Sequence, residues 1–259
     1  MDRRDFIKRS ALVTAGSLLM ASPLGSLFAQ ENENDVENKS NSITNEPHKT
    51  DRNMKVLLIN GSPRKQGNTF TALTEVAKTL EQQGIEAEVV HIGVRPIRGC
   101  IACGQCKSNS LGKCIFDDDV CNRIVEKMEA ADALVVGSPV YYGQPNGSLL
   151  SLMQRMFYAA GDAVQNKPAA AVCVCRRGGA TAAFQTLNMP FQMMNMPVVT
   201  SQYWNIVYGA APGEVSLDAE GLQTMRTLGN NMAWLLKKIH ADAPDYPERE
   251  KGQWTNFIR

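Results

Sequence analysis

Short apolar runs that alternate with amphipathic segments constrain the fold of this chain more than any other feature. Most of the runs are almost wholly apolar, which is typical of a strand that is buried on both faces of a parallel sheet. These runs occupy residues 55–60, 85–92, 133–138, 169–175 and 197–200. Apolar residues recur at helical spacing in the segments 68–83, 120–130, 148–158, 181–194 and 217–239.

Five alternations of strand and helix predict an α/β fold, with a doubly wound, five-stranded parallel sheet in three layers (α/β/α). The chain has 259 residues, of which 44% are hydrophobic, and this suffices for one large domain or two small ones. Ligands of such sheets bind at the carboxyl ends of the strands. We therefore expect the loops that follow the strands to form the site.

The first of these loops, 61–69, reads Gly-Ser-Pro-Arg-Lys-Gln-Gly-Asn-Thr. Its two glycines allow close backbone approach, and a helix N-terminus behind it favours an anion. The loop lacks the Gly-Lys-Ser/Thr of a Walker A motif, so a monophosphate cofactor fits better than a nucleoside triphosphate. The alternative is a plain strand–helix turn with Asn68 as N-cap.

Two further loops follow predicted strands. Loop 138–147 carries two tyrosines between proline and glycine residues, and it could border a flat ring or simply pack as a turn. Loop 175–181 carries two arginines and two glycines, and it could meet a phosphate or a ring edge, or form a solvated charge pair.

Four cysteines interrupt the alternation in the segment 98–118. Cys100, Cys103, Cys106 and Cys114 follow the spacing C-x2-C-x2-C-x7-C. Four thiolates that converge on one point form a soft, anionic ligand set, which suits an iron–sulfur cluster or zinc.

The remaining cysteines and the acidic triplet are interpreted as structural. Cys173 and Cys175 lie on a predicted central strand, where a free cysteine behaves as a small hydrophobe, and Cys121 begins a helix. Residues 117–119 are three aspartates that are typical of a helix N-cap.

The motifs at 61–69, 100–114 and 138–143 together resemble the NADPH-dependent FMN reductase superfamily of flavodoxin-like proteins, and more closely its iron–sulfur flavoprotein branch. The resemblance covers residues 55–240. It implies a flavodoxin-like fold, FMN as cofactor, and a [4Fe–4S] cluster on the four cysteines beside the flavin, with zinc or disulfides as the alternatives. By resemblance the FMN phosphate is held by Ser62, Arg64, Asn68 and Thr69. The ring is bordered by Pro139, Val140, Tyr141, Tyr142 and Gly143, and its third side is closed by Arg177, Gly178 and Gly179.

The N-terminus predicts export. Arg3 and Arg4 precede a Phe-Ile-Lys triplet and the apolar stretch 11–19, which is too short to span a bilayer as a mature helix. This order resembles a twin-arginine (Tat) signal peptide, and an ordinary secretory signal is the alternative. We expect a signal over 1–29, export by the Tat machinery to the periplasm, and a membrane-tethered form if the signal is uncleaved.

The polar segment 30–54 cannot bury enough apolar surface to offset its ordering entropy and is predicted to be a disordered linker, and 241–259 a C-terminal tail. Between them, 55–240 would form the FMN-binding domain with the cysteine-rich insert at 98–118.

The expected function is that of an FMN-dependent oxidoreductase and electron-transfer flavoprotein. No Ser–His–Asp set or carboxylate pair is evident, so the flavin itself would carry the chemistry. A redox protein, a quinone or quinol, or NAD(P)H would exchange electrons with it, and relatives imply a homodimer or homotetramer. Lys and Arg total 27 against 26 for Asp and Glu, so no nucleic-acid partner is indicated. A non-enzymatic electron carrier, an FMN-only quinone or NAD(P)H reductase, and a binding protein without cofactor are the alternatives.

Overall fold

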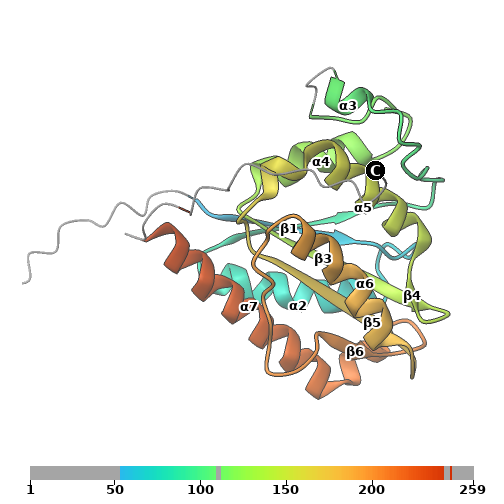
Figure 1. The fold of residues 1–259 in the computed structure, drawn as a ribbon. Coiled ribbons are helices and arrows are strands. Elements are labelled where there is room, and N and C mark those ends of the chain that lie inside the picture. The colour runs from blue at the N-terminus through green and yellow to red at the C-terminus, as the bar shows by residue number, and fades with distance from the viewer. Residues whose placement is uncertain (1–52, 109–111, 242–245, 247–259) are drawn as a thin grey trace, which may run out of the picture. The chain divides into compact units, whose positions relative to one another are not determined.

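A computed structural model describes residues 53–108, 112–241 and 246 of the chain. The signal peptide and linker predictions lie outside these residues, except for the last two linker positions. Residues 53–108 and 112–241 form an alternating pattern of strands and helices (Figure 1). The strands are β1 (Lys55–Asn60), β2 (Glu86–His91), β3 (Ala133–Tyr141), β4 (Gln144–Pro145), β5 (Ala169–Cys175) and β6 (Ile206–Tyr208). The helices are α2 (Asn68–Gln82), α3 (Gln105–Ser108), α4 (Cys121–Ala130), α5 (Gly147–Ala160), α6 (Ala180–Met193) and α7 (Ala219–His240), with 3-10 turns η1 (Gly161–Val164) and η2 (Glu214–Leu217).

The main sheet is parallel, with the strand order β2-β1-β3-β5-β6. This order confirms the doubly wound sheet, and it is the order of flavodoxin-like folds. The order reverses between β1 and β3, so the ends of these two strands form the switch point where such folds bind ligands.

The two faces of the sheet bury separate apolar clusters. Along β1, Leu57 and Ile59 face the cluster built with α4, α5 and α6, whereas Val56 and Leu58 face the cluster built with α2 and α7. Successive side chains of a strand point to opposite faces, so β1 is apolar at consecutive positions because both of its faces are buried. The fold therefore has three layers (Figure 1).

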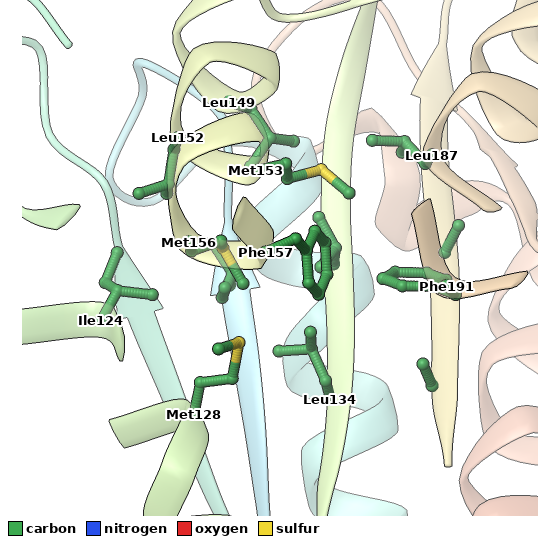
Figure 2. Close-up of a cluster of buried hydrophobic side chains, with 14 of the residues drawn as sticks. Ile124, Met128, Leu134, Leu149, Leu152, Met153, Met156, Phe157, Leu187 and Phe191 are labelled. Carbon is green, nitrogen blue, oxygen red and sulfur yellow. The ribbon is translucent and has the colours of Figure 1, made fainter. Parts of the chain in front are cut away.

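Helices α5 and α6 pack together on the first face. Phe157 of α5 and Phe191 of α6 meet edge to face, with ring centroids 6.0 Å apart (Figure 2). Met156 and Leu149 of α5 are fully buried in the same cluster. Burial of side chains of this size stabilises a fold by about 1.5–3 kcal/mol each. Helix α5 is thus anchored in the core. The loop after β1 contacts its N-terminal end, and the cysteine segment packs against its last turns.

The fifth strand differs from its prediction. The segment 197–200 forms only an isolated bridge, between Val198 and Ala169, and the edge strand is β6 instead. Between the two, Ser201 bonds the backbone of Tyr203 in a turn, and the Asn205 side chain donates to the Ala171 carbonyl. The edge strand is therefore interrupted between residues 199 and 206, where side-chain hydrogen bonds of Ser201 and Asn205 satisfy backbone groups.

The third strand is longer than predicted. It continues past Ser138 to Tyr141 and then pairs antiparallel with β4. Tyr142 and Gly143 both have positive φ, 52° and 77°, as the two-residue turn of a type I′ hairpin requires. The predicted tyrosine loop is thus a tight hairpin that projects from the carboxyl end of β3.

Candidate functional site

Three loops meet at the carboxyl edge of the sheet, because β1, β3 and β5 are neighbours that run in the same direction. The residues predicted to bind the cofactor lie in these loops and in the element ends beside them. Ser62 and Arg64 lie in the loop after β1, and Asn68 and Thr69 begin α2. Pro139 to Tyr141 end β3, Tyr142 and Gly143 form the hairpin turn, and Arg177 to Gly179 lie in the loop after β5.

The loop after β1 is held in shape by hydrogen bonds among its own residues and to the ends of β1 and β2. Asn60 Oδ1 accepts from the Ser62 amide at 3.1 Å, and Ser62 Oγ accepts from the Arg64 amide at 3.1 Å. His91 Nε2 lies 2.8 Å from the Ser62 carbonyl and therefore donates to it. Ser62 is buried, whereas the Arg64 side chain is exposed. The turn is thus a fixed backbone cradle with a free cation at its rim.

Helix α2 starts directly behind this cradle. Its N-cap is Gly67, not Asn68, and no side chain caps it. The first amides of a helix lack intrahelical partners, and a helix of this length carries a positive N-terminal dipole. Since no side chain occupies that position, the arrangement suits a phosphate group.

Asn68 has a different environment from the one predicted. Its Nδ2 donates to the Ala211 carbonyl at 2.9 Å, and its Oδ1 accepts from the Gly213 amide at 3.0 Å. The side chain therefore bridges helix α2 to the loop after β6. Its assignment as a phosphate ligand stays a prediction, as do those of the other residues in the three loops.

The hairpin after β3 is tied to both neighbouring loops. Asn146 Nδ2 donates to the Gly61 carbonyl at 2.7 Å, and Asn146 Oδ1 caps helix α5 through the Ser148 amide. On the other side, a Cβ on Gly179 would lie 2.8 Å from the Gly143 Cα. Only glycine permits this approach, so the three loops form one surface. Tyr142 is fully exposed at the hairpin tip, where it can offer its ring to a ligand.

The four clustered cysteines line one cavity. The cavity volume is about 20 Å³, and it is lined by all four cysteines together with Phe116, Arg155 and Tyr158, among others. Ala102 has a positive φ of 54°, and its amide donates to Cys100 Sγ at 3.4 Å. A non-glycine residue in this conformation is strained, and here it turns the backbone between the first two cysteines.

Within residues 53–108 and 112–241, no group of three or more His, Cys, Asp or Glu side chains is arranged to hold a metal ion. All seven cysteines lie in the described part of the chain, and each is a free thiol. The metal assignment of the four clustered cysteines therefore stays a prediction, supported by their common cavity.

Sequence reasoning missed Arg155. Its guanidinium is buried beneath the cysteine segment, and it donates to Cys114 Sγ at 3.3 Å and pairs with Asp119. Burial alone would lower the pKa of this guanidinium, but hydrogen bonds to Cys114 and Asp119 hold the pKa above its ordinary value. A charged residue among the apolar positions of segment 148–158 was the available signal.

The prediction that the acidic triplet caps α4 is wrong, because the N-cap is Val120 and no side chain caps the helix. Asp119 Oδ1 accepts from the Cys121 amide at the start of α4, while Asp119 Oδ2 pairs with Arg155. Asp118 pairs with Arg98 at the surface, and Asp117 accepts from Asn122. The triplet thus anchors the end of the cysteine segment at three points.

The cysteines outside the cluster are buried. Burial raises the pKa of the Cys121 thiol to about 12, and burial together with Cys175 raises that of Cys173 to about 12. Thiols with such values stay protonated near neutral pH and are poor ligands. The structural interpretation of Cys121 and Cys173 agrees with this geometry.

A second concave surface lies between α5 and α6, with a cavity volume of about 660 Å³. Met189 and Met193 line it and are 64% and 77% exposed. The predicted homodimer or homotetramer stays a prediction. In the part of the chain that the structure describes, no helix has the length and apolar character needed to cross a membrane.

Comparison with known proteins agrees with this geometry. Residues 54–211 match the family of NADPH-dependent FMN reductases. An iron–sulfur flavoprotein of Methanocaldococcus jannaschii is 37% identical over 194 residues, which cover 72% of this chain and 99% of that protein. One from Methanosarcina thermophila is 31% identical over 192 residues, covering 72% and 97%. The solved structure of RosB with bound 8-demethyl-8-formylriboflavin-5'-phosphate has the same fold, with a TM-score of 0.58 at 18% identity, covering 80% of this chain and 94% of RosB. The chain belongs to the NADPH-dependent FMN reductase family and has its flavodoxin-like fold.

Proposed function

We propose that this protein is an exported, FMN-dependent oxidoreductase that holds a [4Fe–4S] cluster beside its flavin and transfers electrons between the two. The observation that carries the proposal is the common placement of both candidate sites on helix α5. The three strand-end loops meet at its N-terminus, and the cavity of the four cysteines lies against its last turns. The names of the relatives as iron–sulfur flavoproteins support it.

The residues at the sheet edge fit FMN. The uncapped N-terminus of α2 and the Ser62 cradle would take the phosphate, with Arg64 at the rim as counter-charge. The type I′ hairpin would border the ring with Tyr141 and Tyr142, and Gly179 allows the third loop to approach it closely. FMN supplies hydride acceptance and single-electron release when bound. The chain itself binds, orients and partly shields the flavin.

The residues of the cysteine cavity fit a cluster. Four free thiols are the ligand type that iron–sulfur clusters require. Hydrogen bonds already reach two of the sulfurs, from the Ala102 amide and from Arg155. Cys106 is buried and Cys114 is half-buried, whereas Cys100 and Cys103 are exposed, so one side of the site faces solvent. An exposed side gives a redox partner direct access.

Helix α5 sets the separation of the two sites. From Gly147, at the hairpin, to Arg155, at the cavity, the axis advances about 12 Å at 1.5 Å per residue. The apolar side chains of this helix are packed in the core. A rigid link between a two-electron and a one-electron centre is what stepwise transfer needs.

The compartment suggests the electron donor. If the twin-arginine leader operates, the protein works where soluble NAD(P)H is scarce, so we propose a quinol or a redox protein as the natural partner. Arg3→Lys together with Arg4→Lys should leave the protein in the cytoplasm, measured by fractionation. Unchanged export would refute the twin-arginine route. Rapid, saturable turnover of NADPH by the exported form would refute the choice of donor.

The decisive experiment is an absorbance spectrum, with iron and FMN quantitation, of anaerobically purified protein. Flavin bands with about four irons per chain are expected for a [4Fe–4S] flavoprotein. Flavin without iron would leave an FMN-only reductase whose cysteines form disulfides or bind zinc. Both centres with negligible turnover would indicate an electron carrier. A colourless chain that takes up no FMN would overturn the proposal.

A further inference from the structure

A buried ion pair lies beneath the cysteine segment, outside the three loops of the candidate flavin site. The side chains of Arg155, on α5, and Asp119, just before α4, are only 1% and 4% exposed. Taking two charges out of water is costly, and an apolar pair of similar volume often packs at least as stably. A charge at this place therefore calls for an explanation other than packing.

The Arg155 guanidinium donates hydrogen bonds to several residues of the cysteine segment. Nε donates to Cys114 Sγ at 3.3 Å, Nη2 to the Phe116 carbonyl at 2.9 Å, and Nη1 to the Arg98 carbonyl at 3.4 Å as well as to Asp119. Every one of these partners lies between residues 98 and 119. One side chain of helix α5 thus holds the segment that carries the four cysteines.

Cys114 makes hydrogen bonds through both its backbone and its side chain. Its amide donates to Asn122 Oδ1 and its carbonyl accepts from Asn122 Nδ2, each at 2.9 Å. Together with the bond from Arg155 to the sulfur, these contacts fix both the backbone and the side chain of Cys114. Such outer contacts orient ligands and tune the centre they bind.

We propose that Arg155 is a positioning residue of the iron–sulfur site, which fixes the Cys114 sulfur and, with the cluster bound, raises the reduction potential through a charged hydrogen bond to that sulfur. This inference deepens the proposed function and rests on it. Reduction by one electron adds one negative charge and moves no proton. A guanidinium stays protonated, so a permanent cation at hydrogen-bond distance favours the reduced form, as hydrogen bonds and net charge do at such centres.

The test uses two matched double variants. Arg155→Met alone would strand the buried Asp119 carboxylate, so it is combined with Asp119→Asn, which keeps an oxygen for the Cys121 amide. The control is Arg98→Met with Asp118→Asn. It removes an ion pair of the same composition from the same segment, but that pair is 2.5 Å apart at the surface, with side chains 47% and 59% exposed. Neither variant changes the net charge.

Iron content and the midpoint potential are measured on anaerobically prepared protein by a redox titration followed with electron paramagnetic resonance. The buried-pair variant should lose iron, or its equilibrium constant for one-electron reduction should fall about tenfold, which corresponds to a potential about 59 mV more negative. The surface-pair variant should match the wild type in both. Equal iron content and equal potential in both variants would overturn the inference.

Hydrogen exchange of the cluster-free proteins separates this inference from the proposed function. Amides of residues 112–122 should exchange faster in the buried-pair variant than in the wild type or the control, while those of β5 keep their protection and show that the fold is intact. If the wild-type chain binds no iron, the proposed cluster is refuted, and exchange alone decides the positioning role. Unchanged protection of 112–122 would then overturn it.

Discussion

Replacing Gly179 by alanine should disturb the contact on which the flavin surface depends. Gly179 has a φ of +85°, and a Cβ there would lie 2.8 Å from the Gly143 Cα and 3.5 Å from Val140 Cγ1. A left-handed conformation costs a non-glycine residue about 1–2 kcal/mol. Since unstrained carbon contacts lie at about 3.5–4.0 Å, the hairpin must also move by up to about 1 Å. Overpacking of this kind costs about 1–3 kcal/mol.

Substitutions at two other glycines separate the cost of the left-handed conformation from the cost of overpacking. Gly84 has a similar φ of +77° but open space around it, so Gly84→Ala carries the conformational cost alone. Gly178 is adjacent to Gly179, has no positive φ and also has open space, so Gly178→Ala should be close to neutral. The expected losses of unfolding free energy are about 2–5 kcal/mol for Gly179→Ala, about 1–2 for Gly84→Ala, and near zero for Gly178→Ala.

Urea denaturation of the FMN-free proteins measures these losses, and quenching of FMN fluorescence measures cofactor affinity. Because the hairpin would border the ring, Gly179→Ala should raise the FMN Kd by about tenfold or more, equivalent to about 1.4 kcal/mol, whereas Gly84→Ala should not. If the Gly179 and Gly84 variants lose the same stability and bind FMN equally well, the reasoning that joins the hairpin to the third loop is wrong.

Two further substitutions test the framework of the site. Asn146→Ala removes both the helix cap of α5 and the bond to the Gly61 carbonyl, so the unfolding free energy in urea should fall by about 1–2 kcal/mol; a smaller loss than that of Ser148→Ala would contradict this role. Cys173→Ala tests the buried thiol, whose pKa burial raises to about 12. The folded protein keeps a proton that the unfolded chain releases above about pH 8.5, so wild-type stability should decline as pH rises from there to about 12. In the variant this decline should be shallower by up to about 1.4 kcal/mol per pH unit, and identical slopes would refute the assignment.

The order of the elements could be predicted because their signals are local. The apolar runs at β1, β3 and β5 are buried on both faces, and all three were expected within a few residues. The edge of the sheet could not be predicted in the same way. A strand with one neighbour is easily interrupted by side chains such as Asn205, and no periodicity in the sequence marks that interruption.

The candidate site also has parts that local sequence patterns predict and parts that they do not. The spacing of the four cysteines and the Gly-Ser-Pro-Arg turn are local patterns, and the structure places the first around one cavity and the second at the sheet edge. The partners of Asn68 lie more than 140 positions away in the chain, at Ala211 and Gly213. No pattern in the neighbourhood of Asn68 predicts them.

The sequence by itself determined the order of the elements up to the edge strand, and which chemical groups follow β1, β3 and β5. These depend on contacts within one turn of helix or along one strand. Only the tertiary structure decided that Gly179 rests on Gly143 and that Arg155 reaches Cys114 from 41 positions along the chain. The physical reason is that burial and long-range hydrogen bonds depend on how layers pack, and packing brings together residues whose local sequences carry no sign of one another.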